Sequence, residues 1–436
     1  MGFLRRWSSL TVIENVVCPF CGCCCDDLEV EVDANRIVSV KNACALGRGK
    51  FLSINEHRLL NPLVKMGDGQ VEVGLEDAVG RVADMLEESV YPVFYGFGCA
   101  SCEAIKLCLE MADRLGGLID NIAVVCHGPT ILGLQDMGMP SATLGQVRHR
   151  ADLIIYWGCN PAEAHPRHMM RYGPLSKGRF VPDRRHRKVV VVDIRRTPTA
   201  RAADLFLQVQ PNSDFEVLTA LRSLVNGFDL EVDEVGGVPV DMLEKLADMM
   251  VEARFGALFF GLGLTMSYGR ERNIEAAVAL VRDLNKKTKF VMIPMRGHFN
   301  VTGANEVFTW QTGYPFCVDF SMGYPRYNPG ETSAVDVMAR GECDILFVVG
   351  ADPYSHLPRS ILEKLKDVKV IVLDPHITPT VKAADVAIPV AHVGVEVSGT
   401  VYRMDGVPLT LKKVVEPPPG IPSDVDVLKS ILRRLV

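Results

Sequence analysis

The sequence predicts an α/β protein whose parallel sheets are covered by helices, preceded by a small cysteine-rich N-terminal part. Two observations lead to this fold class. Short, continuous apolar runs alternate with helical patterns along most of the chain, and such runs are typical of parallel strands buried on both faces. In addition, two long strings from the middle of the chain recur near its end, which indicates a duplicated α/β unit.

The expected elements can be placed in order along the chain. In the cysteine-rich part, residues 1–60, we expect strands at Leu28–Val32 and Arg36–Val40. The later strands are expected at Pro92–Tyr95, Ile122–Val125, Asp152–Trp157, Lys188–Asp193, Ala257–Phe260, Phe290–Ile293, Asp344–Val349 and Val368–Asp374. Helical patterns lie between them, at Cys102–Leu115, Phe215–Val225, Arg272–Asn285 and Arg359–Leu365.

Composition excludes several classes of protein. The 436 residues are 48% hydrophobic and 23% charged, which leaves room for two or three domains. The net charge of −6 indicates no nucleic-acid partner, and no apolar run is long enough for a membrane span. Arg5 and Arg6 suggest a twin-arginine export signal, but no apolar segment follows and Cys18 comes too soon. Most of the thirteen cysteines lie in clusters or in apolar segments, which is unlike the disulfide framework of a secreted protein. We therefore expect a cytoplasmic protein.

The repeat consists of two strings that each occur twice. The string Asp152-Leu-Ile-Ile-Tyr-Trp-Gly-Cys-Asn-Pro161 recurs as Asp344-Ile-Leu-Phe-Val-Val-Gly-Ala-Asp-Pro353. The string Val192-Asp-Ile-Arg-Arg-Thr-Pro-Thr-Ala-Arg-Ala-Ala-Asp204 recurs as Leu373-Asp-Pro-His-Ile-Thr-Pro-Thr-Val-Lys-Ala-Ala-Asp385. A weaker pair is Phe94–Gly98 with Phe259–Gly263. The shared Asp, Thr-Pro-Thr and Ala-Ala-Asp pattern is too specific to be a chance match of apolar strands.

The repeat has a functional and a structural interpretation. Ligands of open α/β sheets lie beyond the carboxyl ends of the strands, where a glycine lets a phosphate approach the backbone and an aspartate accepts ribose hydroxyls. Two copies of this arrangement predict two copies of one nucleotide-like ligand. The alternative is a duplicated α/β domain that keeps these turn residues for folding alone.

The strongest local motif is Cys18-x2-Cys21-x3-Cys25, with Cys44 further along the chain. Three thiolates from one tight loop and one distal cysteine suit a [4Fe–4S] cluster. Zinc is the competing ion because four cysteines also bind it, although paired Cys-x2-Cys knuckles are its usual pattern. Cys24 could replace Cys25 as the third ligand, and we prefer Cys25.

A second motif, Cys126-His127-Gly-Pro129, directly follows the expected strand Ile122–Val125. A thiolate at the carboxyl end of a strand would face the ligand crevice, and a soft thiolate suits a high-valent, sulfur-rich metal centre. The adjacent imidazole could carry a proton or orient a substrate. Taken alone, a single buried cysteine is more often a small core residue.

Together these motifs resemble the molybdopterin oxidoreductase superfamily, which includes formate dehydrogenases. In its detailed sequence, the chain is similar to the B subunits of the formylmethanofuran dehydrogenases, from about residue 16 to its end. The strings that carry the resemblance are Cys18–Gly22, Cys25–Asp27, Asn42–Gly47, Tyr156–Pro161, His165–His168 and Pro294–Val301.

The resemblance implies a cofactor and a site. The cofactors would be a [4Fe–4S] cluster and a bis-molybdopterin guanine dinucleotide carrying tungsten or molybdenum with a sulfido ligand; the sequence does not distinguish the two metals. Cys126 would be the protein ligand of that metal, and His127 and Arg296 would act on the substrate. A guanidinium can hold a carboxylate through paired hydrogen bonds, and phosphate binding is the alternative role of Arg296. Contacts to the pterin dinucleotides are expected from Trp157, Gly158, Asn160, Asp193, Thr197, Gly261, Gly263, Gly297, Asn300, Gly350, Asp352 and Asp374.

Some positions depart from the pattern or stay open. Formate-oxidising relatives often carry a lysine two residues after the fourth cluster cysteine, where this chain has Leu46; Arg48 or Lys50 could replace it. Cofactor diphosphates would need positive charge, and candidates near the first repeat are Arg167, Arg171, Arg184, Arg185, Arg195 and Arg196. For Arg184 and Arg185 we prefer a solvated or subunit-facing surface. Core or loop positions are expected for Cys99, Cys102, Cys108, Cys159, Cys317 and Cys343.

The resemblance also implies domains like domains I–III of formate dehydrogenases. Residues 1–60 would form the cluster domain. Residues 61–125 with 299–436 would form one Rossmann-like pterin-dinucleotide domain, and residues 126–298 an inserted second one. Complete members add a C-terminal β-barrel over the cofactor, and the residues after Asp385 are too few for it, so we expect a partner to supply this lid.

The implied activity is the reversible reduction of CO2 to formate, the first step of methanogenesis from CO2, with formate passed on for condensation with methanofuran. The implied partners are a small D-type lid subunit, an amidohydrolase-like A-type subunit, a C-type subunit and ferredoxin-type subunits. A formate dehydrogenase is the alternative within the superfamily. The alternative from another functional class is a non-catalytic scaffold that only conducts electrons. Such a protein would be expected to have lost Cys126, His127 and Arg296.

Overall fold

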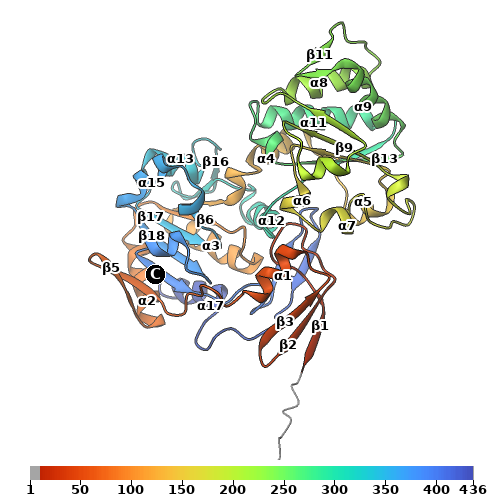
Figure 1. The fold of residues 1–436 in the computed structure, drawn as a ribbon. Helices are drawn as coiled ribbons and strands as arrows, with labels where there is room; N and C mark the ends of the chain where they lie inside the picture. The colour runs from red at the N-terminus through yellow and green to blue at the C-terminus, as the bar shows by residue number, and fades with distance from the viewer. Residues whose placement is uncertain (1–9, 436) are drawn as a thin grey trace, which may run out of the picture. The chain divides into compact units, whose positions relative to one another are not determined.

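The computed structural model describes residues 10–435, so Arg5 and Arg6 lie outside it. The described chain divides into two compact units (Figure 1). Unit 1 comprises the chain up to Val124, residues His298–Arg403 and the chain from Pro408. Unit 2 comprises Val125–Gly297 and the short segment Met404–Val407. No helix within residues 10–435 is long and apolar enough to cross a membrane.

Unit 1 begins with a three-stranded antiparallel sheet. Its strands are β1 (Thr11–Val16), β2 (Leu28–Asp33) and β3 (Arg36–Lys41), in the order β1-β2-β3. The cysteine loop connects β1 to β2, and helix α1 (Ala45–Leu52) follows β3. The side chain of Cys44 caps α1 by accepting a hydrogen bond from the backbone N–H of Gly47, so the distal cysteine is held at the start of this helix.

The main sheet of unit 1 has nine strands in the order β16-β15-β7-β6-β17-β18-β19-β4-β5. The five strands from β7 to β19 are parallel, and the pairs at both edges are antiparallel. The strands are β4 (Leu63–Met66), β5 (Gly69–Glu72), β6 (Pro92–Gly96), β7 (Leu118–Asn121), β15 (Val318–Asp319), β16 (Arg326–Tyr327), β17 (Ile345–Val349), β18 (Lys369–Asp374) and β19 (Val386–Pro389). The central strands β6 and β17 are buried along their whole length, as continuous apolar runs require.

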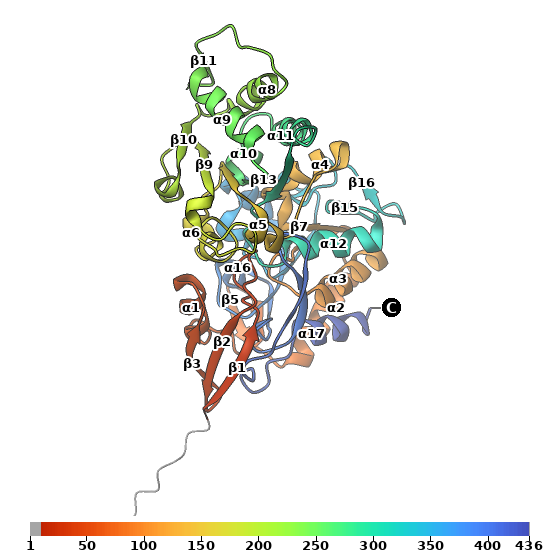
Figure 2. The ribbon, with the colours of Figure 1, turned by 90° about the vertical axis from the view of Figure 1, so that its right-hand side faces the viewer.

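Helices cover both faces of this sheet. One core packs α2, α3, α12 and α17 against the sheet, and Figure 2 shows these helices together on one side of it. A second core on the sheet contains residues of α13, α15 and α16. The helices are α2 (Leu75–Glu87), α3 (Cys102–Leu115), α12 (Val301–Thr312), α13 (Ala334–Arg340), α14 (Pro353–His356), α15 (Arg359–Lys364), η4 (Leu365–Asp367), α16 (Pro379–Ala383) and α17 (Asp424–Leu432). A hairpin of β20 (Gly399–Tyr402) and β21 (Pro408–Leu411) precedes α17.

Unit 2 is built on a five-stranded, wholly parallel sheet in the order β10-β9-β8-β13-β14. Its strands are β8 (Leu153–Trp157), β9 (Lys188–Asp193), β10 (Leu205–Gln208), β13 (Phe255–Phe260) and β14 (Lys289–Pro294). Apolar residues of α8, α9 and α11 form one core with these strands. The 3-10 helix η1 (Ile122–Val125) leads along the chain from unit 1 into unit 2. The remaining elements of unit 2 are α4 (Gly128–Met137), α5 (Leu144–Arg150), α6 (Pro161–Ala164), α7 (His168–Arg171), η2 (Arg184–His186), η3 (Pro198–Ala202), α8 (Asp214–Val225), β11 (Glu234–Val235), β12 (Val238–Pro239), α9 (Val240–Glu252), α10 (Leu262–Thr265) and α11 (Glu271–Leu284).

The two parallel sheets share one strand order. The order β19-β18-β17-β6-β7 in unit 1 matches β10-β9-β8-β13-β14 in unit 2, with the repeated strings on corresponding strands. The chain passes through these positions in a different sequence in each unit, because β6 and β7 come first in unit 1 whereas β13 and β14 come last in unit 2. The α/β class with parallel sheets is therefore confirmed.

One expected strand is wrong. Ile122–Val125 is a 3-10 helix, and the strand lies four residues earlier, at Leu118–Asn121. Gly116 ends α3 with a φ of 62°, so β7 begins directly after the glycine pair. The side chain of Asn121 then accepts a hydrogen bond from the N–H of Ala123 at 3.0 Å, which stops the extended chain. Cys126 accordingly follows a 3-10 turn, and not the carboxyl end of a strand.

Candidate functional site

Cys126 and His127 lie between η1 and helix α4 of unit 2. His127 is the N-cap residue of α4, and Pro129 occupies the first turn, where proline is well tolerated. The backbone carbonyl of Cys126 accepts a hydrogen bond from the Thr265 hydroxyl at 2.9 Å. The pair is thus fixed at the start of a helix and against the end of α10, with the Cys126 side chain half-buried.

The ring of His127 is fully buried and has a hydrogen-bond partner at each nitrogen. Nδ1 lies 3.0 Å from the Thr130 hydroxyl, and Nε2 lies 3.4 Å from the carbonyl oxygen of Met295. Because a carbonyl only accepts, the ring proton is on Nε2 and Nδ1 accepts from Thr130. Burial lowers the pKa of His127 to about 3, and the positive charge of Arg296 acts in the same direction. The imidazole is therefore neutral and oriented.

Arg296 follows strand β14 and is buried in the same part of unit 2. Its backbone carbonyl accepts a hydrogen bond from Nε2 of His165 at 2.8 Å, so His165 holds the Arg296 backbone in place. Burial raises the pKa of the Cys126 thiol to about 11, and the charge of Arg296 opposes this rise. The charge of Arg296 therefore acts on both Cys126 and His127, although these residues are up to 170 positions apart in the sequence.

A pocket of about 390 Å³ opens beyond the carboxyl ends of the unit 2 strands. Five of the expected nucleotide-contacting residues line it, together with Arg195: Gly158, Asn160, Asp193, Thr197 and Gly263. The pocket adjoins two glycines that meet face to face. A Cβ on Gly158 would lie 2.8 Å from Gly263, and one on Gly263 would lie 2.6 Å from Gly158. Gly158 also has a φ of 54°, so a side chain at this position would be strained as well as blocked.

The pocket in unit 2 suits a nucleotide. The hydroxyl of Thr197 is buried and has no hydrogen-bond partner within residues 10–435, although buried polar groups are nearly always paired. Burial raises the pKa of Asp193, whose carboxylate accepts from the N–H of Arg195 at 3.3 Å. A hydroxyl, a carboxylate and a backbone that admits close approach together fit the ribose and phosphate groups of a dinucleotide.

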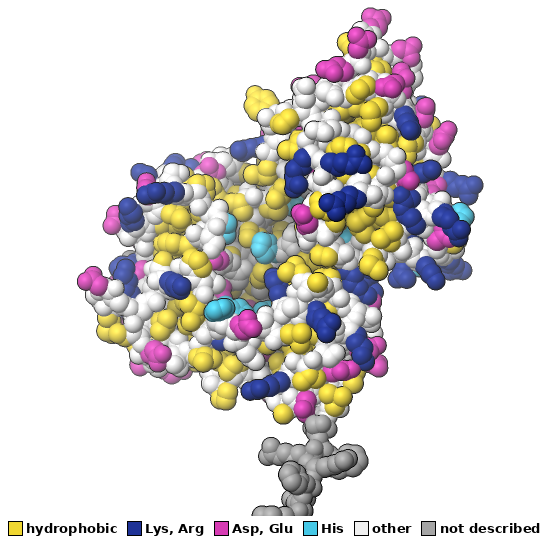
Figure 3. Space-filling model, in the orientation of Figure 1, with side chains coloured by type: hydrophobic (Ala, Val, Ile, Leu, Met, Phe, Trp, Pro, Cys, Tyr) yellow, Lys and Arg dark blue, Asp and Glu magenta, His cyan; other side chains and the backbone are white. Residues whose placement is uncertain are grey.

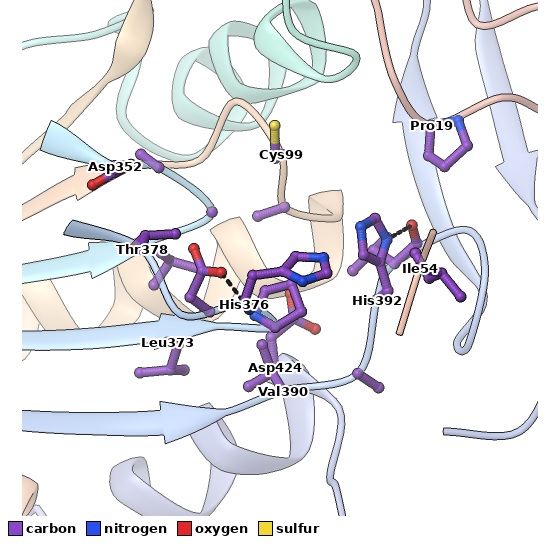
Figure 4. Close-up of a pocket in the computed structure, with 18 of the residues that line it drawn as sticks. Pro19, Ile54, Cys99, Asp352, Leu373, His376, Thr378, Val390, His392 and Asp424 are labelled. Carbon is purple, nitrogen blue, oxygen red and sulfur yellow. Dashed lines mark hydrogen bonds between the residues drawn. The ribbon is translucent and has the colours of Figure 1, made fainter. Parts of the chain in front are cut away.

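The corresponding pocket of unit 1 is larger, at about 620 Å³. It contains the expected Gly350, Asp352 and Asp374, and it lies beyond β17 and β18. Figure 4 shows the rings of His376 and His392 side by side in this pocket, with Asp352 and Thr378 together at its other end. The centroids of the two histidine rings are 5.7 Å apart. The histidine-rich wall, which also includes His298 and His57, has no counterpart in the unit 2 pocket.

The repeated threonine has the same role in both units. The Thr199 hydroxyl donates to Oδ1 of Asn160 at 2.6 Å and accepts from the N–H of Ala162 at 3.1 Å. In unit 1 the Thr380 hydroxyl donates to Oδ1 of Asp352 and accepts from the N–H of Tyr354 at 3.2 Å. The second threonine of each Thr-Pro-Thr string therefore fixes the loop, whereas the first, Thr197 or Thr378, lines the pocket.

Several expected contact residues lie elsewhere. Trp157 is fully buried and donates its indole N–H to Asp214 at 2.8 Å, and Gly261 packs against Cys159. Asn300 is also fully buried, where it donates to the carbonyl of Ala100 at 2.7 Å and accepts from the N–H of Tyr402 at 2.9 Å. Gly297 has open space around its Cα. None of these four residues lines one of the two pockets.

The basic residues near the first repeat separate into different roles. Arg195 lines the unit 2 pocket, and Arg196 lies over the ring of Phe206 at 5.5 Å. Arg184 pairs with Asp204 at 3.0 Å, and Arg185 pairs with Asp183 at 3.2 Å. Arg171 lies over the ring of Tyr172 at 5.1 Å.

The loop between β1 and β2 brings cysteines of the N-terminal motif together. The N–H of Cys18 donates to the carbonyl of Cys25 at 2.9 Å, which closes the loop. A Cβ on Gly47 would lie 3.3 Å from Sγ of Cys18 and 3.6 Å from Sγ of Cys44. The distal cysteine therefore reaches the loop, and burial together with Cys21 and Cys25 raises the pKa of Cys18. Four thiols from one loop and one helix start fit a [4Fe–4S] cluster.

The two other cysteines of the loop point differently. Cys24 packs in an apolar cluster with Phe299 and Leu411, and its thiol faces the carbonyl of Phe299 at 3.3 Å. Cys23 is buried against Cys21, whose thiol it stabilises as the anion, so the pKa of Cys21 is lowered. Within residues 10–435, no three His, Cys, Asp or Glu side chains form a group that could hold a single metal ion.

Lys50 is the cation that accompanies the cysteine loop. It lies over the ring of Phe20 at 5.5 Å and lowers the pKa of Cys21, and it lines the unit 1 pocket. Leu46 and Arg48 do not line that pocket. The histidines of the unit 1 pocket, Thr130 and His165 were not identified from the sequence as site residues, since no spacing rule places them there. Only the Thr-Pro-Thr repeat signalled Thr199 and Thr380.

Solved structures with a similar fold include two enzymes. One is the formyltransferase/hydrolase complex FhcABCD of Methylorubrum extorquens with methylofuran, at a TM-score of 0.69 and 21% identity, covering 86% of this chain and 98% of that one. The other is acetylene hydratase from Pelobacter acetylenicus, at a TM-score of 0.69 and 17% identity, covering 97% and 69%. At these identities the likeness shows the fold alone.

Sequence comparison finds relatives with higher identity. The chain is 47% identical to the B subunit of the tungsten-containing formylmethanofuran dehydrogenase 2 of Methanocaldococcus jannaschii, over 97% of this chain and 98% of the relative. It is 44% identical to the protein of that name from Methanococcus maripaludis, over 98% and 99%. Formate dehydrogenase H of Escherichia coli is 25% identical, over 96% of this chain and 68% of that protein. The molybdopterin oxidoreductase family matches residues 58–434, and the chain therefore belongs to this family and, within it, to the B subunits of the formylmethanofuran dehydrogenases.

Proposed function

We propose that this chain is the catalytic subunit of a tungsten-dependent formylmethanofuran dehydrogenase that reduces CO2 to formate in the cytoplasm. The observation that carries the proposal is the grouping of Cys126, His127 and Arg296, a soft ligand, a neutral hydrogen-bond donor and a buried cation. Reduction of CO2 consumes two electrons and one proton per formate. The names of the relatives at 44–47% identity support this substrate and this metal.

Each of the three residues has a distinct role in this proposal. A bis-pterin guanine dinucleotide with tungsten supplies the two-electron redox chemistry when bound, and Cys126 is its protein ligand. The Arg296 guanidinium holds the carboxylate of formate, which its planar donors match. His127 carries its proton on Nε2, where the contact to the Met295 carbonyl is long at 3.4 Å. That N–H can turn to a substrate oxygen without leaving a strong hydrogen bond.

The remaining cofactor sites are assigned on the same basis. The pockets of unit 1 and unit 2 each hold one nucleotide end, supported by Asp374 with Gly350 in the first and by Asp193 with Gly158 in the second. Cys18, Cys21, Cys25 and Cys44 hold a [4Fe–4S] cluster that supplies electrons, and Cys24 is a core residue of the loop.

The chain works with partner subunits in this proposal. The relatives at 44–47% identity are named as subunits, and they match this chain over 98–99% of their own length. A small lid subunit lies over the cofactor. An amidohydrolase-like subunit joins formate to methanofuran, and ferredoxin-type subunits deliver electrons.

Three alanine variants of the assembled enzyme test the proposal. Cys126→Ala should abolish CO2 reduction with a reduced viologen. His127→Ala and Arg296→Ala should keep tungsten and lower turnover about 10²–10³-fold, the usual cost of losing one preorganised hydrogen-bond donor. Matched controls are Cys343→Ala, a buried core cysteine of unit 1, and Arg282→Ala, an exposed arginine of unit 2.

Elemental analysis accompanies these rates. We expect tungsten, and not molybdenum, in the wild-type enzyme and in the His127 and Arg296 variants. Wild-type turnover in Cys126→Ala would refute the assignment of the metal ligand. Loss of metal and pterin in Arg296→Ala would instead identify this arginine as a phosphate-binding residue.

A further inference from the structure

One segment of unit 2 has the opposite charge to the rest of the chain. Residues 148–188 contain ten lysines and arginines against three acidic residues, in a chain with a net charge of −6. The segment runs from the end of α5 through β8, α6 and α7 to the start of β9. Figure 3 shows Lys and Arg side chains gathered on this part of unit 2, at the right of the view.

A buried arginine organises the segment. Arg187 is 1% exposed, and its guanidinium donates to the carbonyls of Ala151 at 3.1 Å and Val181 at 3.2 Å. It also donates to the carbonyls of Arg148, Gly173, Pro174 and Ser176 and to the Ser176 hydroxyl. These acceptors come from the end of α5 and from the loop 173–181. One side chain therefore binds the whole loop to the helix and fixes its conformation.

The loop presents an exposed phenylalanine between two arginines. Phe180 is 58% exposed, with the guanidinium of Arg150 4.6 Å and that of Arg179 5.7 Å from its ring centroid. The backbone holds this arrangement, because the N–H of Phe180 donates to the carbonyl of His149 at 3.0 Å. Leu175 nearby in the loop is also exposed.

The cations of this surface have no anionic partner in the described chain. Between residues 10 and 435, no Asp or Glu oxygen lies within 4.0 Å of a side-chain nitrogen of Arg148, Arg150, Lys177 or Arg179. Arg184 and Arg185, just outside the loop, do have such partners. An exposed aromatic ring with unpaired arginines around it, on a loop that is already ordered, is typical of a binding hot spot.

We propose that this arginine–phenylalanine surface, formed by Arg148–Arg150 and Lys177–Phe180, docks an acidic segment of a partner protein in the enzyme complex. The proposal rests on the proposed function only in that the chain works within a multi-subunit enzyme. An acidic protein segment complements the unpaired cations, and an apolar side chain beside it can cover Phe180. A second copy of this chain placed on the same surface would bring like charges together. The net charge of −6 disfavours a nucleic acid as the occupant.

Site-specific cross-linking in the assembled complex tests the proposal. A photoreactive phenylalanine analogue replaces Phe180, and in a matched control it replaces Phe228, which is 67% exposed in the same unit. We expect the probe at position 180, and not at 228, to cross-link to an Asp- and Glu-rich segment of another subunit. No cross-link at 180, or a cross-link to nucleic acid or to a second copy of this chain, would overturn the proposal.

Charge reversal provides an independent readout. Arg150→Glu with Arg179→Glu should lower the affinity for the cross-linked partner about tenfold or more and shift its release to lower salt. The control is Lys245→Glu with Arg282→Glu, an equal change of charge at exposed positions of unit 2. Thermal unfolding checks that both variants are folded. Equal salt dependence of the two variants would refute the docking role, and because assembly is measured, this outcome is separate from any failure of CO2 reduction.

Discussion

Replacing Arg187 with methionine should destabilise unit 2 by about 3–5 kcal/mol. The guanidinium is the shared donor for six backbone carbonyls and one hydroxyl, and the described chain places no carboxylate in contact with it. Burial lowers the pKa of this arginine, because a buried positive charge costs free energy. The change to methionine removes that cost together with the charge. The loss that remains is that of buried carbonyls without donors, each worth about 1–3 kcal/mol and far from additive. A methionine fills the volume but donates nothing.

Urea unfolding and hydrogen exchange measure this effect. We expect a lower unfolding midpoint for the Arg187→Met variant and faster exchange of backbone amides in the loop 173–181. Arg185→Met is the matched control, because the Arg185 side chain is 88% exposed and its loss should change stability by no more than about 0.5 kcal/mol. An unchanged midpoint together with unchanged loop exchange would show that the loop does not depend on Arg187.

Three further predictions address other parts of the molecule. Cys25→Ser should lower the iron content and remove the cluster EPR signal, whereas Cys24→Ala should retain both, and the reverse result would place Cys24 in the ligand set. Thr199→Val and Thr380→Val should each destabilise the chain by about 1–3 kcal/mol in denaturant titrations, since each removes a hydrogen bond to Asn160 or Asp352 and leaves the N–H of Ala162 or Tyr354 without its acceptor; wild-type midpoints would contradict this role. Burial raises the pKa of Asp120 to about 7, above about 3.9 in an unfolded chain, so the folded state holds this proton more tightly. The protonated carboxyl therefore stabilises the fold below pH 4, and the free energy of unfolding falls by about 4 kcal/mol as the pH rises to 7. If Asp120→Asn kept the full wild-type dependence of unfolding free energy on pH, this assignment would be refuted.

Seven of the ten parallel strands in the described chain could be predicted, because each is a short, continuous apolar run. The sequence analysis did not predict β7, β10 or β19, each of which is only four residues long. The prediction of a strand at Ile122–Val125 was wrong for a local reason. The sequence shows the apolar run, but it does not show the hydrogen bond from the N–H of Ala123 to the Asn121 side chain, which turns the chain at this point. Periodicity reports burial, and a buried 3-10 turn is as apolar as a buried strand. The position of Cys126 after that turn could not be derived without the structure.

The repeat predicted the pockets better than it predicted individual contacts. Its terminal aspartates have a structural role, since Asp204 accepts from the N–H of Val189 at 2.7 Å and Asp385 accepts from the N–H of Val370 at 2.9 Å. The structural interpretation of the repeat therefore applies to these aspartates, whereas other residues of the same strings line the two pockets. The histidines of the unit 1 pocket have no counterpart in the repeat, and nothing in their sequence spacing would have placed them together.

The strand order of unit 1 has a consequence for synthesis on the ribosome. Strand β6 pairs with β17, whose first residue, Ile345, is made about 250 residues later. At about 5–20 residues per second this delay is roughly 12–50 s. During that time β6 and β7 remain as a half-formed sheet without the neighbouring strand β17, while all five strands of the unit 2 sheet have already been translated. The nascent chain thus exposes an aggregation-prone intermediate, which chaperones should bind before the chain is released. Slow codons between residues 125 and 297 would prolong this state.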